Sequence, residues 1–261
     1  MITDLFDPTD EPIISPQAFY GEQGHLCDVC IVLFSKVIFE ELLRRYPCTQ
    51  AAQIGACNGN IPIYTFDLEG RPVAFYLSPI GSAMASTGVI EANWLTGATK
   101  FVMFGSAGAL DRAKTAGRYV VPTAAYRGEG MSYHYAAPAD YIDVPGAETV
   151  CGVFDALGAP HVTGLVFTTD AIYREMRRQI AARRAEGCIA VEMELAGVQA
   201  VCSHYGFALY DFLMTGDVLD APVYTPEGLR EANHSLDKLD LALEIAKRVQ
   251  ALPARADNPD K

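Results

Sequence analysis

The chain has 261 residues, of which 50% are hydrophobic, and its formal net charge is -12. This length and apolar content suffice for one large α/β domain, residues 1–261, with a substantial core. The acidic balance disfavours nonspecific binding to nucleic acid or to an anionic membrane surface. No apolar run reaches about 18 residues, and the N-terminus is acidic rather than basic and then apolar, so we expect a cytoplasmic protein without a membrane partner.

The N-terminal segment, residues 1–25, is rich in Pro, Asp and Gly, and we expect it to lie on the surface as an arm. Seven cysteines are scattered through apolar segments, which is typical of reduced core residues rather than of a disulfide framework. Cys27 and Cys30 form a CxxC motif, but no second pair or nearby histidine completes a zinc set. We therefore expect neither a metal nor an organic cofactor.

The N-terminal half of the chain alternates between apolar strand patterns and helical spacing. The expected elements are a buried strand at 29–34, a helix at 37–46 that stops at Pro47, a hairpin of strands at 61–67 and 72–80, and a helix at 83–95. Small residues from Gly81 onward follow the hairpin. Such residues permit either close backbone approach to a ligand or tight helix packing, and the sequence leaves both readings open.

A short apolar strand at 101–104 is followed by Gly105, Ser106, Ala107 and Gly108. We expect these four residues to form a turn. Backbone N–H groups and a hydroxyl in such a turn suit an anion or an activated water.

The C-terminal half continues the alternation of strand and helix patterns. The expected elements are strands at 119–123 and 161–169, a helix at 173–186, a final helix that begins near Thr225, and a flexible polar tail at 253–261. The loop from Ala125 to Tyr135 is dense in aromatic and hydrogen-bonding groups. It belongs either to a binding site or to a surface loop folded on its own tyrosines. The five arginines of the 173–186 helix are expected to form a solvated face.

Two acidic residues lie at a strand-to-helix junction. Residues 188–191 predict a short buried strand, and the apolar residues from Leu195 onward recur at helical spacing. Glu192 and Glu194 fall between them, on either side of Met193. Acids in the first turn of a helix are favourable against its dipole, so a purely structural role is an alternative for each.

A third acid, Asp217, follows the apolar strand at 207–214. The carboxyl ends of strands are where open α/β sheets bind ligands. Burying several carboxylates is costly unless they are paired or used. Such an arrangement suits a site that holds a polyhydroxyl group with one carboxylate and exchanges a proton with another.

These residues also carry a resemblance to a known family. The segment VEMELAG at 191–197, followed by TGD at 215–217, resembles the VEMEAAG and VSD signatures of the purine nucleoside phosphorylase and uridine phosphorylase family, which includes the methylthioadenosine/S-adenosylhomocysteine nucleosidases. The segment FTTDAIY at 167–173 is similar to the family's FSADLFY. Gly216 stands where the second signature usually has a serine. The resemblance extends from Val29 to Val249.

The resemblance implies a three-layer α/β/α fold with a twisted mixed sheet that is partly closed into a barrel. It also implies a homo-oligomer, either a dimer or a trimer of dimers, because the pockets of the family are completed by a neighbouring subunit. The family's N-terminal histidine that reaches the next subunit has no clear counterpart here.

Residue by residue, the resemblance implies a nucleoside site. Glu194 would bind the 2′- and 3′-hydroxyls of ribose, Met193 would pack under the sugar, and Glu192 would lie near sugar or base. Phe167 would flank the base, and Asp217 would protonate or hydrogen-bond the purine N7 as the glycosidic bond breaks. The remaining substrate-binding candidates are Gly81, Gly105, Ser106 and Ala107, of which Gly105 and Ser106 would face the attacking phosphate or water. An acid near the base lowers the barrier because the departing base gains negative charge.

The nucleophile is inorganic phosphate if the chain acts like most of the family, and the products are free base and ribose-1-phosphate. The two arginines that usually bind phosphate fall at Phe39 and Met103. Lys36, Arg71 or Arg127 would then have to replace them, with help from Ser106.

Two alternatives follow from the missing arginines. Water is the nucleophile in the nucleosidases, although the glutamate that activates it there has no equivalent at 35–37. The other alternative is a nucleoside-binding module that kept the ribose-binding carboxylate and lost the nucleophile site.

The base is predicted to be a purine. Uridine phosphorylases bind uracil with a Gln-x-Arg pair after the family's tyrosine, whereas Met176 and Arg178 stand in the aligned positions after Tyr173. Asp217 is placed to reach a purine N7. The loop at 127–135 resembles the RDEGTSYHY segment of uridine-type members, so uridine phosphorylase stays an alternative.

Overall fold

A computed structural model of the chain describes residues 2–7, 9–221 and 223–253. Its α-helices are α1 (Pro16–Tyr20), α2 (Lys36–Arg45), α3 (Ser82–Thr96), α4 (Arg112–Thr115), α5 (Ala147–Leu157), α6 (Arg177–Ala185), α7 (Leu195–Tyr205), α8 (Leu229–His234) and α9 (Asp237–Gln250). Three 3₁₀ helices are η1 (Ile2–Leu5), η2 (Met131–His134) and η3 (Ile172–Arg174). The tail expected at 253–261 lies outside the described residues, apart from residue 253. No helix in the described ranges is long and apolar enough to cross a membrane.

The described strands form one mixed sheet that closes partly on itself. They are β1 (Val29–Leu33), β2 (Thr49–Ile54), β3 (Ile61–Leu68), β4 (Arg71–Leu77), β5 (Lys100–Ala109), β6 (Tyr119–Gly128), β7 (Tyr141–Asp143), β8 (His161–Thr169), β9 (Cys188–Glu192) and β10 (Ala208–Val218). Their order is β10-β6-β8-β9-β5-β1-β4-β3-β2, and β7 pairs with β6. Because β10 also pairs with β5, the strands β10, β6, β8, β9 and β5 close into a barrel.

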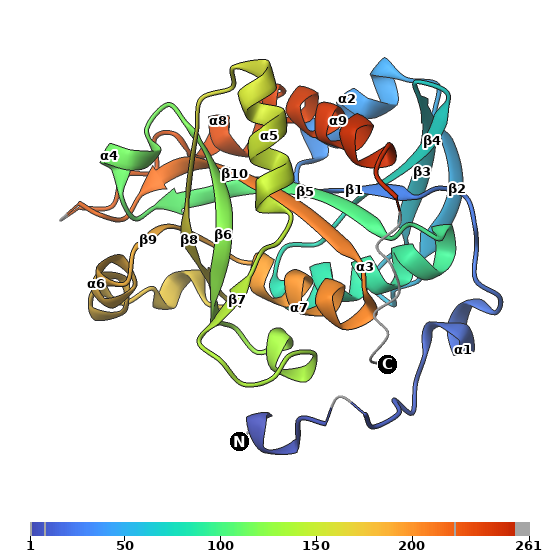
Figure 1. The fold of residues 1–261 in the computed structure, drawn as a ribbon, viewed down its shortest axis with the longest axis horizontal. Helices are drawn as coiled ribbons and strands as arrows, with labels where there is room; N and C mark the ends of the chain where they lie inside the picture. The colour runs from blue at the N-terminus through green and yellow to red at the C-terminus, as the bar shows by residue number, and fades with distance from the viewer. Residues whose placement is uncertain (1, 8, 222, 254–261) are drawn as a thin grey trace.

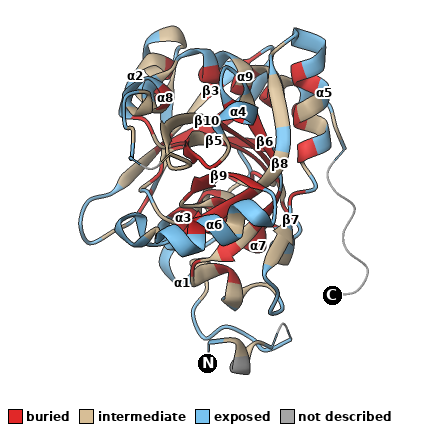
Figure 2. Ribbon diagram, turned by 90° about the vertical axis from the view of Figure 1, so that its left-hand side faces the viewer, coloured by how far each residue is buried: buried red, intermediate tan, exposed pale blue. Residues whose placement is uncertain are grey.

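Helices cover both sides of the sheet, as Figure 1 shows. The helices α2, α5, α8 and α9 lie on one side, and α3 and α7 lie on the other. Each side has its own apolar cluster, one formed with α3 and α7 and the other with α2, α5 and α9. The buried residues gather on the strands and on the helix faces that meet them (Figure 2). The predicted three-layer fold with a partly closed barrel is therefore confirmed.

The expected turn at Gly105–Gly108 is wrong, because these residues continue β5. Gly105 pairs with Leu213 of β10, and Gly108 pairs with both Asp217 of β10 and Val191 of β9. Two neighbouring strands hold the segment extended. The N–H groups that a turn would have offered to an anion lie in a strand instead.

Three further expectations differ from the structure. The loop expected from Ala125 begins only after Gly128, because β8 pairs with β6 as far as Gly128 and Thr169, and η2 follows. The helix expected at 173–186 is divided into η3 and α6 by the extended backbone of Met176. The final helix is divided at Ser235, which has extended backbone between α8 and α9. The helix α5 and the strands β2 and β7 were not predicted.

Two cations hold the C-terminal end of α9. Lys100, buried at the start of β5, donates from Nζ to the carbonyl oxygens of Val249 (3.0 Å) and Leu252 (2.5 Å). Arg71 donates from Nη1 to the carbonyl oxygen of Gln250 (2.6 Å). Cations at this end of a helix are favourable because the last carbonyls lack helical partners and carry the negative end of the dipole.

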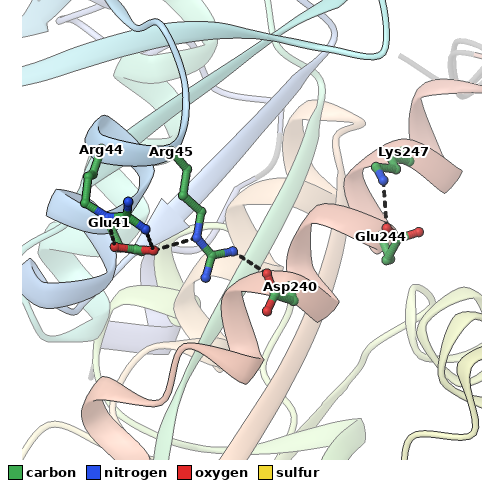
Figure 3. Close-up of polar contacts among 6 residues, drawn as sticks. All are labelled: Glu41, Arg44, Arg45, Asp240, Glu244 and Lys247. Carbon is green, nitrogen blue, oxygen red and sulfur yellow. Dashed lines mark hydrogen bonds and ion pairs between the residues drawn. The ribbon is translucent and has the colours of Figure 1, made fainter.

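Ion pairs connect α9 to α2 across the surface. Figure 3 shows Arg45 of α2 between Glu41 of the same helix and Asp240 of α9. The Asp240 side chain is 61% exposed. Exposed pairs of this kind contribute roughly 0.2–1 kcal/mol each, so the apolar contacts determine how the two helices pack.

Candidate active site

A cavity of about 360 Å³ lies at the carboxyl ends of β1, β5, β9 and β10. This is the sheet edge where ligands bind in open α/β folds. Of the residues predicted from the sequence, its wall contains Ser106, Ala107, Glu192, Met193, Glu194 and Asp217. The structure therefore brings together three acids that the sequence places on two different strands.

Glu192 ends β9 and is buried with partners on both carboxylate oxygens. Its Oε1 accepts a hydrogen bond from the Thr168 hydroxyl, and its Oε2 accepts from the backbone N–H groups of Glu194 and Leu195, both at 2.7 Å. Burial and the charge of Glu194 raise the pKa of Glu192, while these hydrogen bonds lower it. Glu192 thus holds the N-terminal turn of α7 and fixes the backbone of Glu194.

Glu194 is the N-cap residue of α7, and its carboxylate is held from a second element. Its Oε1 accepts a hydrogen bond from the backbone N–H of Gly81 at 2.7 Å. Gly81 has a φ of 106°, a conformation that favours glycine, immediately before α3. Burial raises the pKa of Glu194, and the Gly81 N–H opposes that shift. Gly81 therefore acts on the site through its backbone, by orienting Glu194.

Asp217 lies near the end of β10, next to a β-bulge. The register of β10 with β5 shifts between Thr215 and Asp217, which makes Gly216 the extra residue. A bulge redirects the side chains that follow it. The Asp217 carboxylate lines the cavity, and its Oδ1 is 3.4 Å from the position that a Cβ on Gly108 would take.

Glu175 is a fourth carboxyl group in the cavity wall, and sequence reasoning missed it. It lies between η3 and α6, where a continuous solvated helix was expected. Burial, and then the neighbouring Asp217, raise its pKa to about 7. Near neutral pH this carboxyl is therefore part protonated, and it can both donate and accept hydrogen bonds.

The other wall of the cavity contains a buried cation, Lys238, which sequence reasoning also missed. Lys238 is the second residue of α9, is 1% exposed, and donates from Nζ to the carbonyl oxygen of Gly105 at 3.1 Å. Burial lowers its pKa to about 8. A signal was available, because Lys238 continues the row of Ala242, Ile245 and Val249, all buried along one side of α9.

Two hydrogen-bonded pairs flank Lys238 in this wall. Ser35, the N-cap of α2, lies with its Oγ 2.8 Å from His234 Nδ1 and accepts from the Ile38 N–H at 3.3 Å. The Ser106 hydroxyl donates to Asn233 Oδ1. These four side chains line the same cavity as Lys238.

Four predicted site residues lie outside the cavity wall: Gly81, Gly105, Phe167 and Arg127. Phe167 is fully buried and packs against Tyr126, with ring centroids 5.6 Å apart. Arg127 is 3% exposed, and its guanidinium donates to Ser132 Oγ (2.8 Å) and to the carbonyl oxygens of Ala137 (2.6 Å) and Ala136 (3.2 Å). The structure thus gives Arg127 a structural role in folding the loop after β6.

The other cations considered for phosphate are also outside the cavity wall. Lys36 is exposed and lies 3.6 Å from Glu40 Oε1 on the same helix, and Arg71 bonds to the end of α9. Phe39 and Met103, where the related phosphorylases carry arginines, pack in the two apolar clusters. Neither set supplies a cation to this site.

The sequence matches the phosphorylase superfamily over residues 28–252, and the chain therefore belongs to that superfamily. A DeoD-type purine nucleoside phosphorylase from Colwellia psychrerythraea is 27% identical over 184 residues, which cover 69% of this chain and 78% of the relative. The uridine phosphorylase of Escherichia coli is 27% identical over 157 residues, which cover 54% of this chain and 61% of that enzyme. The resemblance seen in the sequence is thus confirmed at the level of an enzymatic superfamily.

A solved structure shares the fold. The crystal structure of AMP nucleosidase from Bacteroides thetaiotaomicron matches with a TM-score of 0.66 and 17% identity, over 86% of this chain and 89% of that one. At this identity the match supports the architecture and not a substrate.

Proposed function

We propose that the chain cleaves the N-glycosidic bond of a purine ribonucleoside by phosphorolysis, giving the free base and ribose-1-phosphate. One observation carries this proposal: Glu194 and Asp217 line the same cavity as Lys238 and Ser106. The acids suit the sugar and the base, whereas the lysine suits an anionic nucleophile.

Glu194 is the group proposed to hold the ribose. A carboxylate that accepts hydrogen bonds from the 2′- and 3′-hydroxyls binds more strongly than a neutral acceptor, because these bonds are charge-assisted. The N–H of Gly81 and the buried Glu192 fix its position before substrate arrives. The same negative charge stabilises the oxocarbenium character that the sugar gains in the transition state.

Asp217 is the group proposed to assist the departing base. As a phosphate oxygen bonds to C1′, the bond from C1′ to the base nitrogen breaks and its electron pair leaves with the base. A proton from Asp217 to the purine N7 neutralises that charge, and such general acid catalysis contributes roughly 10²–10⁴-fold. Glu175 lies in the same wall and supplies a second carboxyl for the N–H groups of a purine.

Hydrolysis is the second candidate, and His234 is the observation that favours it. Its Nδ1 lies 2.8 Å from Ser35 Oγ, and its ring lines the cavity. An imidazole is the most frequent general base and can take a proton from an attacking water. The products would then be free base and ribose.

The test is to incubate the protein with inosine, adenosine and uridine, each with and without phosphate, and to identify the sugar product. We expect purine cleavage that requires phosphate and yields ribose-1-phosphate. Asp217→Asn should lose most turnover while it retains nucleoside binding, and Glu194→Gln should lose binding of the ribose. Cleavage of uridine alone would contradict the purine assignment, and ribose as the sole sugar product would establish hydrolysis instead.

A further inference from the structure

Lys238 is placed where a buried charge is unfavourable. It lies in the first turn of α9, at the positive end of the helix dipole, and is almost completely buried. Among the described residues no carboxylate forms an ion pair with it. Its contacts are the Gly105 carbonyl at 3.1 Å and the Phe104 ring, whose centroid is 5.9 Å from Nζ. An ammonium has three N–H donors, so this carbonyl uses one and an anion in the cavity would use more.

The groups that surround Lys238 are suited to bind the phosphate oxygens that Lys238 itself does not bind. Ser35 and Ser106 carry hydroxyls, Asn233 an amide and His234 an imidazole, and all four line the cavity. The Asn233 amide and the imidazole can donate hydrogen bonds to phosphate oxygens, and the Ser35 and Ser106 hydroxyls can do so by turning from their present partners, whereas one ammonium supplies the charge. The wall therefore combines a cation with neutral donors, on the side of the cavity formed by α8, α9 and the ends of β1 and β5.

Close contact between the backbones of Gly216 and Gly228 positions the cavity wall that contains Lys238. A Cβ on Gly216 of β10 would lie 2.7 Å from Leu229 Cα and 2.8 Å from Ala232 Cβ. A Cβ on Gly228 would lie 2.3 Å from the Gly216 carbonyl oxygen. The backbone before α8 thus touches the bulge of β10, which requires glycine at both positions. Asn233 and His234 end α8, and Lys238 follows at the start of α9.

We propose that Lys238 binds the phosphate nucleophile in this chain, and that α8 and α9 supply the cation that two arginines supply in the related phosphorylases. The inference rests on the proposed phosphorolysis and names the residue responsible for it. Lys238 keeps its proton throughout: it neutralises phosphate while one phosphate oxygen bonds to C1′ and the base leaves with the electron pair. Gly216, which replaces the usual serine, is part of the same arrangement because it permits the approach of α8.

Steady-state kinetics at pH 7, with phosphate and nucleoside varied independently, test this assignment. For Lys238→Met we expect the KM for phosphate to rise about 10–100-fold, the effect of losing a hydrogen-bonded charge, with little change in the KM for nucleoside. Lys238→Arg keeps the cation and should restore much of the phosphate affinity. Lys247→Met, on the same helix but outside the cavity, is the matched control and should leave both constants unchanged.

The pH dependence gives a second readout. Wild-type KM for phosphate should rise above pH 8, because the Lys238 ammonium, whose pKa burial lowers to about 8, loses its proton. Glu175, Glu192, Glu194, Asp217 and His234 face the same cavity and are unchanged in every variant. Comparison with Lys238→Arg isolates the effect of the lysine on the KM for phosphate. A guanidinium stays charged in this range, so the KM for phosphate of Lys238→Arg should not rise.

Three results would overturn the assignment. The first is an unchanged KM for phosphate in Lys238→Met that a melting curve shows to be folded. The second is an equal rise of both Michaelis constants, which would indicate general distortion of the site. The third is the same pH profile in wild type and Lys238→Arg. A wild-type rate that is independent of phosphate would refute phosphorolysis itself before any variant is made, so the two failures are distinguishable.

Discussion

A buried lysine lies at each end of α9: Lys100 of β5 at the C-terminal end and Lys238 of α9 itself at the N-terminal end. The two lysines have opposite surroundings. At the C-terminal end Lys100 donates to two backbone carbonyls at the negative end of the helix dipole. At the N-terminal end Lys238 donates to one carbonyl, at the positive end of the dipole and beside a cavity. Both are nearly inaccessible, at 4% and 1% exposed. Burial alone therefore does not separate a structural cation from one that serves a ligand.

The difference lies in what satisfies each charge. The partners of Lys100 belong to the fold, so its stabilising contribution is complete in the free protein. Within the part of the chain that the structure describes, the surroundings of Lys238 offer its positive charge a single carbonyl oxygen and no paired carboxylate. Its charge therefore stabilises the form of the protein that has an anion bound in the cavity. Mutations at the two positions should thus have opposite effects on stability.

The largest effect on stability is expected at the C-terminal end of α9, where Lys100 lies. Lys100→Met should lower the free energy of unfolding by about 2–4 kcal/mol, because it leaves two carbonyls at the buried end of α9 without a donor. Urea unfolding measures this change, and the KM for phosphate should stay at its wild-type value. A loss below that of the half-buried control Lys247→Met would mean that Lys100 does not hold α9.

Gly216→Ala tests the contact with Gly228 that positions α8 and the N-terminal end of α9. The added Cβ meets backbone of α8, so we expect a loss of about 1–3 kcal/mol in stability, as for other overpacked sites. The KM for phosphate should rise with it, since α8 and α9 shift together. Gly152→Ala in α5 is the matched control: nothing lies within 4 Å of its Cβ, and alanine is the better helix former. A Gly216→Ala protein with wild-type phosphate affinity would separate the glycine contact from the anion site.

Lys238→Met should do the reverse of Lys100→Met and stabilise the protein by about 1–2 kcal/mol at pH 7, after the lost Gly105 hydrogen bond is subtracted. Burial lowers the folded-state pKa of Lys238 to about 8 from its ordinary 10.5. Between these values the unfolded chain binds more protons, so wild-type stability rises with pH there and the variant lacks this rise. Urea unfolding at pH 7 and at pH 10.5 measures the difference, which should reverse sign at the higher pH, because the charge penalty is then largely gone and the lost hydrogen bond to Gly105 remains. Destabilisation at pH 7 would show Lys238 to be structural after all.

The smallest effect is expected on the outer surface of α9. Asp240→Asn removes the exposed partner of Arg45 shown in Figure 3 and should cost roughly 0.2–1 kcal/mol. The loss should shrink in 1 M salt, where the Debye length is about 3 Å. A salt-independent loss would point to the packing of α9 on α2 rather than to charge.

The strand and helix spacing around Glu192, Glu194 and Asp217 was enough to predict that these acids meet. β9 and the first half of β10 read clearly because they are buried apolar runs. β9 runs antiparallel to β5 and β10 runs parallel to it, and the carboxyl ends of both pair with Gly108. Gly81 was also predicted, although its contribution is a backbone N–H to Glu194. The local sequence pattern thus suffices to predict which side chains the central strands place at the cavity.

Residues that depend on pairing between distant segments were harder to predict. Gly105 and Ser106 read as a turn because small residues follow an apolar run, yet pairing with β10 keeps them in a strand. Arg127 read as a free cation in a loop, while in the structure each of its three guanidinium nitrogens donates to the hydroxyl or backbone of that loop. Lys238 was not singled out from the sequence. Its place in the buried row of α9 indicates burial, but its position beside the cavity depends on the packing of α8 against β10.

The barrel is closed by the last strand of the chain, and this order has a consequence for folding. Ala208 of β10 pairs with Lys100 of β5, far back in the sequence, and Leu213 pairs with Val120 of β6. Until β10 leaves the ribosome, β5 and β6 expose unpaired backbone edges of the kind that invite aggregation. Contacts over such separations also slow folding. During synthesis the nascent chain should therefore remain a client for chaperones until its C-terminal fifth has emerged, and α8 and α9 can complete the cavity only after that point.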